Sequence, residues 1–309
     1  MRKGSLLSCS IFLLLAHFQV QSQSAGKSQA ASTQHSPASA HYTGKIIDMH
    51  VHIALLPGES TSLSNERTNT LKDILAFMAP SSIVRVGIIT MALKGNMTET
   101  RLRNDSLITL HQQNPSLIPI CSVHPMDGAD ARAEMERVHN LGVRIIKLHP
   151  NTQRFDVGAP EVDSIAAKAA ELHMILLFDS YSPWDANEIG KLILLAVSHG
   201  DAQFIFAHTG LVNFPQLLTL TALEKYPWFK NNIWMDVSAI APLLGDSPFR
   251  DQLVWTMRRV GIDHFIFGSD FPVFTPIESI KGVHALHLTK EEEKKVFYTN
   301  ACRLLEIQP

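Results

Sequence analysis

The sequence predicts an α/β fold, the single-domain (β/α)8 or TIM barrel, on three observations. Short apolar segments alternate regularly with amphipathic stretches from residue 45 onward. The apolar segments are nearly continuous, which is typical of parallel strands covered on both faces. The segment 44–309 also comes close to the roughly 250 residues of such a barrel. An open doubly wound sheet would alternate in the same way, but no glycine-rich phosphate loop follows the first strand.

The expected strands are short runs rich in Ile, Val, Leu and Phe. They cover residues 45–52, 83–89, 117–123, 143–148, 174–178, 204–207, 233–237 and 264–268. The stretches that follow them are amphipathic with helical periodicity. They cover residues 71–79, 102–112, 129–141, 162–172, 187–198, 214–224 and 250–260. A closing helix is expected over 289–305, because Thr289 and Glu292 form a capping-box pair at its start.

Residues 1–22 have the features of a signal peptide. Arg2 and Lys3 precede an apolar run at 11–16, and small residues allow cleavage after Ser22. The run is shorter than the roughly 20 residues that a membrane-spanning helix needs. We therefore expect a secreted or periplasmic protein with no membrane span in its mature form.

Residues 23–43 are rich in Ser, Ala and Gln without hydrophobic periodicity, and we expect a disordered linker there. The domain then occupies 44–309. The chain carries 27 Lys and Arg residues against 29 Asp and Glu residues. This balance, without a basic patch, excludes nucleic acid as the expected partner and favours a small-molecule substrate.

Titratable side chains gather at the ends of the expected strands. His50 and His52 close the first strand, and residues two apart in a strand point to the same face. The strand ends read in order are His50, His52, His124, Lys147, His149, Asp179, His208 and Asp270. The C-terminal strand ends are where barrels of this class place their chemistry. Imidazole and carboxylate groups that converge there suit Zn²⁺, Fe²⁺ or Mn²⁺.

Four of these segments resemble the metal-dependent hydrolases of the amidohydrolase superfamily, in its amidohydrolase-related branch (amidohydrolase 2). They read DMHVH at 48–52, KLHP at 147–150, AHTG at 207–210 and GSDFP at 268–272. The ending VFYTNACRLL at 296–305 is similar to the closing helix of that branch. The resemblance runs from residue 45 to near 305, and the order and spacing of the motifs make it specific.

The resemblance implies a role for each matching residue. His50 and His52 would be metal ligands, and Asp270 would be both a ligand and the base that takes a proton from metal-bound water. His208 would bind a second metal or polarise water and substrate. Lys147 matches the position where some relatives carry a carboxylated lysine between two metals, whereas other members bind one metal and use that position differently.

The chain departs from the family pattern at the end of the fifth strand, where relatives present a histidine. Asp179 stands there as a substitute ligand, or the alignment slips by one and leaves Phe178 in that place. We therefore expect one divalent ion rather than two, with Zn²⁺ first and Mn²⁺ or Fe²⁺ as alternatives. A metal-free barrel that binds a ligand without turnover is the non-enzymatic alternative.

The expected activity is that of a metal-dependent hydrolase, in which a metal-activated water attacks an amide, lactone or ester carbonyl. Metal-dependent decarboxylation is the alternative reaction, and it would need a cation for the substrate carboxylate. Arg144, Lys147 and Arg154 are the candidates for it. His124 and His149 each precede a proline and either contact substrate or make structural hydrogen bonds. The family resemblance also suggests a homodimer.

Overall fold

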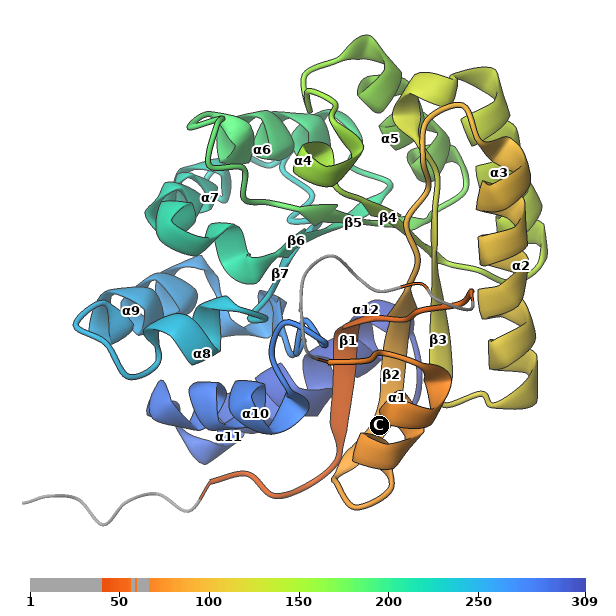
Figure 1. Ribbon diagram of the computed structural model, residues 1–309. Coiled ribbons are helices and arrows are strands. Elements are labelled where there is room, and N and C mark those ends of the chain that lie inside the picture. Colours follow the sequence, from red (N-terminus) through yellow and green to blue (C-terminus); the bar gives the residue numbers. More distant parts are fainter. Residues whose placement is uncertain (1–40, 57–58, 60–66) are drawn as a thin grey trace, which may run out of the picture. The chain divides into compact units, whose positions relative to one another are not determined.

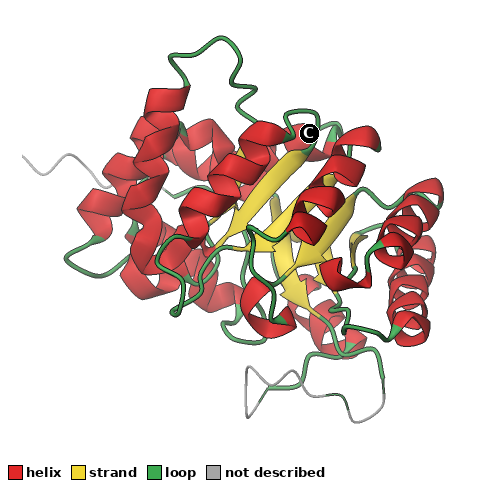
Figure 2. Ribbon diagram, turned by 90° about the horizontal axis from the view of Figure 1, so that it is seen from above, coloured by secondary structure: helices red, strands yellow, loops and turns green. Residues whose placement is uncertain are grey.

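Eight parallel strands form the centre of the fold, and each strand pairs with its neighbours in the sequence. The computed structural model describes residues 41–56, 59 and 67–309. The strands are β1 (Ile46–His52), β2 (Ile83–Ile89), β3 (Leu117–Ser122), β4 (Ile145–Leu148), β5 (Ile175–Asp179), β6 (Gln203–Ala207), β7 (Ile233–Asp236) and β8 (Phe265–Ile266). Figures 1 and 2 show the helices arranged around these strands. The predicted TIM barrel is confirmed.

The barrel closes between β1 and the chain that follows β8. The amide of Met49 donates to the carbonyl of Phe267 at 3.0 Å, and the amide of Asp270 donates to the carbonyl of His50 at 2.8 Å. The amide of His52 donates to the carbonyl of Phe271 at 2.8 Å. This seam therefore places the end of β1 directly beside Asp270.

The α-helices cover most of the predicted stretches. They are α1 (Leu71–Met78), α2 (Met97–Gln113), α3 (Ala129–Asn140), α4 (Pro150–Gln153), α5 (Pro160–Glu171), α6 (Glu188–Ser198), α7 (Thr219–Leu223), α8 (Ile240–Leu244), α9 (Arg250–Val260), α10 (Pro276–Ala285), α11 (Lys290–Lys294) and α12 (Asn300–Leu305). Among the residues described, every helix is too short or too polar to cross a bilayer.

Two predicted helices differ from the observed ones for local reasons. The helix α2 begins five residues earlier than expected, because the side chain of Asn96 accepts from the amide of Glu99 and caps it there. The stretch predicted over 214–224 divides into a 3₁₀ segment, His208–Leu218, and the short α7. That segment starts with left-handed residues and contains Pro215, which has no amide hydrogen to donate.

The closing helix is interrupted but begins where the sequence predicts. Thr289 and Glu292 make the expected capping box at the start of α11. A π-turn over Lys295–Thr299 then separates α11 from α12. From α12, Ala301 and Leu304 join the buried cluster that fills the barrel interior. The predicted signal peptide and most of the predicted linker lie outside the described residues.

Candidate active site

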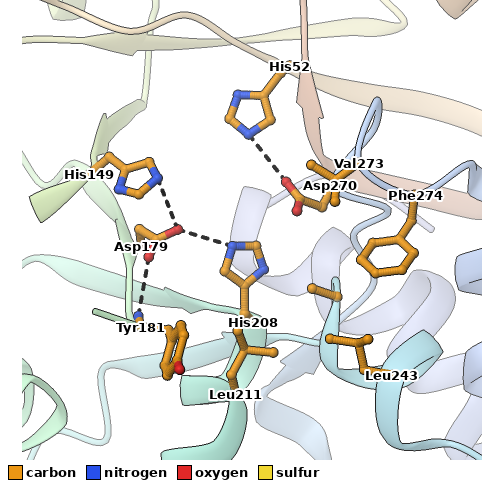
Figure 3. A pocket seen from close by; sticks show the side chains of 11 residues that line it. His52, His149, Asp179, Tyr181, His208, Leu211, Leu243, Asp270, Val273 and Phe274 are labelled. Atoms are coloured by element: carbon orange, nitrogen blue, oxygen red, sulfur yellow. Dashed lines mark hydrogen bonds and ion pairs between the residues drawn. The ribbon is translucent and has the colours of Figure 1, made fainter. Parts of the chain in front are cut away.

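A cavity of about 320 Å³ opens at the C-terminal ends of the strands. Five of the predicted site residues line it, and Figure 3 shows their side chains pointing toward one another. They are His52, His149, Asp179, His208 and Asp270. The rest of the lining is mostly apolar and comes from Tyr181, Leu211, Ala239, Leu243, Val273 and Phe274.

His50, His52 and Asp270 form a compact group of donor atoms on the β1 side of the cavity. The Oδ1 atom of Asp270 lies 3.3 Å from Nε2 of His52 and 3.6 Å from Nε2 of His50. All three residues are buried, and one ligand atom of each lies within 4.8 Å of the others. A bulge in β1 between Asp48 and Val51 adds one residue to that strand, and bulges of this kind re-aim side chains.

The orientation of His50 is set by Asp236 at the end of β7. Nδ1 of His50 lies 2.8 Å from Oδ2 of Asp236. Because that carboxylate accepts a hydrogen bond from Nδ1–H, Nε2 carries no proton and directs its lone pair toward Asp270. Burial, and then the nearby charge of Lys147, lower the pKa of His50 to about 4. The imidazole is therefore neutral at neutral pH, which is the form that ligates metals.

Asp236 is the residue of this site that sequence reasoning overlooked. Its other oxygen, Oδ1, accepts from the amides of His208 at 2.9 Å and Ser238 at 3.0 Å and from the Ser238 hydroxyl. Burial alone would raise the pKa of Asp236, but His50 and these hydrogen bonds hold it below its usual range. Its position at the end of β7 could have identified it. The acidic residues at two other strand ends, Asp179 and Asp270, were considered as site residues for that reason.

On the opposite side of the cavity, Asp179 accepts a hydrogen bond from His208 and lies close to His149. Its Oδ2 atom lies 3.1 Å from Nε2 of His208 and 3.4 Å from Nε2 of His149. Burial would lower the pKa of His208, but the carboxylates of Asp270 and Asp179 outweigh it and raise that pKa to about 9. Phe178 packs into the hydrophobic cluster beside Phe204, so Asp179 is the residue of β5 that faces the cavity.

Lys147 is fully buried beneath the site and does not line the cavity. Its Nζ atom lies 3.5 Å from Nε2 of His50. Burial lowers the pKa of Lys147, and the carboxylates of Asp179 and Asp236 oppose that shift. The other candidate cations also lie away from the cavity lining: Arg144 pairs with Glu306 at 2.8 Å, and Arg154 is exposed.

The two histidines that precede prolines have different surroundings. His149 lines the cavity and contacts Asp179. His124 lies outside the lining, with Nε2 at 2.8 Å from the carbonyl of Gln153 and Nδ1 accepting from the amide of Met126 at 3.2 Å. Both of its ring nitrogens are thus engaged by the backbone. These contacts favour the structural alternative for His124, whereas substrate contact by His149 stays a prediction.

The donor set fits a divalent transition metal. His50 and His52 offer imidazole nitrogens, Asp270 offers a carboxylate, and Asp236 supports His50 from behind as such sites require. Burial would raise the pKa of Asp270, but His208 and the histidines of β1 lower it to about 2, so this carboxylate is ionised at neutral pH.

Solved structures of similar fold include enzymes of two reaction types. 2,6-Dihydroxybenzoate decarboxylase from Rhizobium is 15% identical, with 85% of this chain and 99% of that chain covered at a TM-score of 0.66. Dihydroxybenzoic acid decarboxylase from Polaromonas sp. JS666, solved with bound manganese and an inhibitor, is 16% identical over 85% and 97% at a TM-score of 0.67. A putative 2-pyrone-4,6-dicarboxylic acid hydrolase from Pseudomonas putida is 17% identical over 86% and 98% at a TM-score of 0.63.

These identities are low enough that the likeness to solved structures establishes the shared fold alone. A comparison with curated proteins finds no match. The family model described as amidohydrolase matches residues 47–307, which include all of the barrel strands except Ile46, the first residue of β1, and each residue of the cavity. The chain therefore belongs to the amidohydrolase family, whose members are enzymes.

Proposed function

We propose that this protein is a metal-dependent hydrolase in which water attacks the carbonyl carbon of a small amide, lactone or ester and breaks its bond to the leaving nitrogen or oxygen. The observation that carries the proposal is the convergence of His50, His52 and Asp270, of which His52 and Asp270 line the cavity. A divalent ion held by these groups would lower the pKa of a bound water and polarise a carbonyl group.

Asp270 is the group that we assign to proton transfer. It is ionised at neutral pH, it lies against His52 at 3.3 Å, and it lines the cavity. In this position it can accept the proton of the attacking water and return it to the leaving group.

His208 supplies positive charge to the other side of the cavity. With a pKa raised to about 9, its imidazole is protonated at neutral pH while Asp179 holds Nε2. A fixed positive charge near the reacting carbonyl stabilises the negative charge that develops on its oxygen. We assign His208 to that role and Asp179 to the positioning of His208 and His149.

We propose one ion per active site, with Zn²⁺ first and Mn²⁺ or Fe²⁺ as alternatives. Lys147 lies below the cavity lining, and Asp179 is occupied by two histidines. Neither the buried position of Lys147 nor the histidine contacts of Asp179 favour a second ion between these two residues. Imidazole and carboxylate donors suit each of these three metals.

Hydrolysis is favoured over decarboxylation because the cationic His208 is already paired with Asp179, and the described lining residues offer no further strong cation for a substrate carboxylate. Within the described part of the chain, neither Lys nor Arg lines the cavity, and its remaining wall is apolar. A neutral substrate suits such a lining better than a carboxylated one. Decarboxylation stays the alternative reaction, because solved proteins of this fold carry it out.

The test is a substrate panel assayed in H₂¹⁸O with the metal-reconstituted protein. The panel holds neutral amides, lactones and esters together with carboxylated aromatic acids. We expect one ¹⁸O atom in the carboxylate product per turnover from the first group, without release of CO₂, and no turnover by Asp270→Asn. Release of CO₂ from the aromatic acids would establish the decarboxylase instead. Absence of turnover across both groups would favour a ligand-binding barrel.

A further inference from the structure

A second cluster of metal-binding side chains lies away from the cavity, where the chain enters the barrel. It consists of His41, His284 at the end of α10, and Glu293 in α11. Nδ1 of His41 and Nδ1 of His284 each lie 2.8 Å from the same oxygen, Oε1 of Glu293. Oε2 of Glu293 accepts from the amide of Tyr42 at 2.6 Å. None of these residues lines the active-site cavity.

The charge of Glu293 is not balanced by a strong cation. Its side chain is fully buried, and its ion-pair partners among the described residues are His41 and His284. A buried carboxylate is costly unless a full opposite charge compensates it. The two imidazoles approach the same carboxylate oxygen through their Nδ1 atoms. A divalent ion would supply the missing charge.

The donor atoms are held in place by aromatic packing. The ring of His284 lies edge-on to Phe297 at 5.5 Å, and the ring of Tyr42 stacks on the same Phe297 at 6.2 Å. The rings of His41 and His284 are 4.2 Å apart. One ligand atom from each of the three residues lies within 4.8 Å of the other two. The cluster is thus largely formed before any ion binds.

We propose that His41, His284 and Glu293 bind one divalent transition-metal ion of the Zn²⁺ class, separately from the active site. Two imidazoles and one carboxylate are a standard zinc donor set. Binding requires each imidazole to present its lone pair at Nδ1 and to carry its proton on Nε2. His41 is 51% exposed in its side chain, so water can complete the coordination.

The ion would fasten the segment before β1 to the two helices that follow β8. His41 precedes β1, whereas His284 and Glu293 belong to α10 and α11 (Figure 1). A ligand that binds the folded state and not the unfolded chain stabilises the fold. The site therefore has a structural role and leaves the reaction at the cavity unchanged.

The test is a ZnCl₂ titration by isothermal calorimetry in the His50→Ala/His52→Ala background, in which the active site has lost two donors. We expect one Zn²⁺ per chain there. Adding His41→Ala should lower the stoichiometry to zero, and adding Glu293→Gln should do the same. His287→Asn is the matched control and should retain the ion, because His287 is exposed, stands outside the cluster, and has a left-handed backbone that asparagine tolerates.

A second measurement shows whether the His41→Ala variant is still folded. The half-exposed His41→Ala variant should match its parent in circular dichroism and in Tm without zinc. Zinc should raise the Tm of the parent and not of the variant. An unchanged stoichiometry in His41→Ala, or no zinc binding by the parent, would overturn the proposal. Either result leaves the active-site proposal standing, because both proteins already lack His50 and His52.

Discussion

The Asp236 carboxylate decides which nitrogen of His50 faces Asp270. It lies 2.8 Å from Nδ1 and has no contact with the cavity itself. A side chain of the same shape without the charge would let His50 carry its proton on either nitrogen. The metal binding that we propose for the β1 histidine pair would therefore depend on a residue 186 positions away from His50 in the sequence.

Replacement of Asp236 by Asn should weaken metal binding by roughly 10–100-fold, the usual effect of losing such a supporting carboxylate. The fall follows from losing the acceptor that fixes the tautomer of His50. The measurement is a competitive zinc titration, in the His41→Ala background, that yields the dissociation constant. Asp246→Asn, at an exposed position, is the control and should leave the constant unchanged. Equal affinity in the His41→Ala parent with and without Asp236→Asn would contradict this role.

Glu188, the first residue of α6, is a buried carboxyl group that should make the stability of the fold depend on pH. It is 4% exposed, and its Oε1 atom has no hydrogen-bond partner. Burial, and then the charges of Asp179 and Asp185, raise its pKa from 4.5 to about 8. The folded protein thus keeps this proton to a higher pH than the unfolded chain does. The resulting stabilisation is complete below pH 4.5 and is lost as the pH rises through 8.

Glu188→Gln should remove that pH dependence. Between pH 5 and pH 8.5, the free energy of unfolding of the wild type should fall more than that of the variant, by about 1–3 kcal/mol. The variant should be the more stable of the two at pH 8.5. Urea unfolding at both pH values measures this difference. Parallel changes in the two proteins would show that Glu188 is ionised throughout.

The site residues that the sequence revealed are those with a recognisable neighbour. His50, His52 and Asp270 lie within short motifs, so both their place at a strand end and their chemistry were visible. Asp236 lies in the strand IWMD, which has no motif of its own. The pairing of Asp236 with His50 became visible only when the barrel placed β7 against the site. His124 shows the converse, since a histidine at a strand end can be fully engaged by the backbone.

At the scale of elements, the sequence predicted the interiors of most helices, whereas local hydrogen bonds determine where the helices begin and end. The helix α9 occupies the predicted residues 250–260. The helix α10 was not predicted, although Thr275 and Glu278 carry the same capping-box pair that announced α11. A short amphipathic run between β8 and the closing helix gave too little periodicity to be recognised. The caps were the more informative signal there.

That cap supports a testable expectation for α10. Oγ1 of Thr275 accepts from the amide of Glu278 at 3.2 Å, and Ser279 in the same helix donates to the carbonyl of Ser269 at 3.1 Å. Thr275→Ala should lower the free energy of unfolding by about 1 kcal/mol, since the amide loses its acceptor. Thr275→Ser keeps the hydroxyl and should cost little. Chemical denaturation compares the three proteins, and equal losses in both variants would indicate a packing effect of the methyl group instead.

At the scale of the whole molecule, barrel closure joins residues from the two ends of the domain. The seam between β1 and the chain after β8 brings His50 and His52 to Asp270, more than 200 positions away. Alternation of strands and helices was enough to predict this architecture, because parallel strands in a barrel have one common active face. The distances and tautomers within the site depend on side-chain packing, which no local pattern encodes. Secretion stays a prediction, since the N-terminal segment lies outside the described residues.

The central claim is that His50, His52 and Asp270 hold a catalytic metal ion, and metal content measures it most directly. The His41→Ala variant, which lacks the second proposed site, is reconstituted with zinc or manganese, freed of unbound ion, and analysed by elemental mass spectrometry. We predict one ion per chain, and none after His50→Ala and His52→Ala are added. An ion that persists without these histidines, or no ion in either protein, would contradict the account.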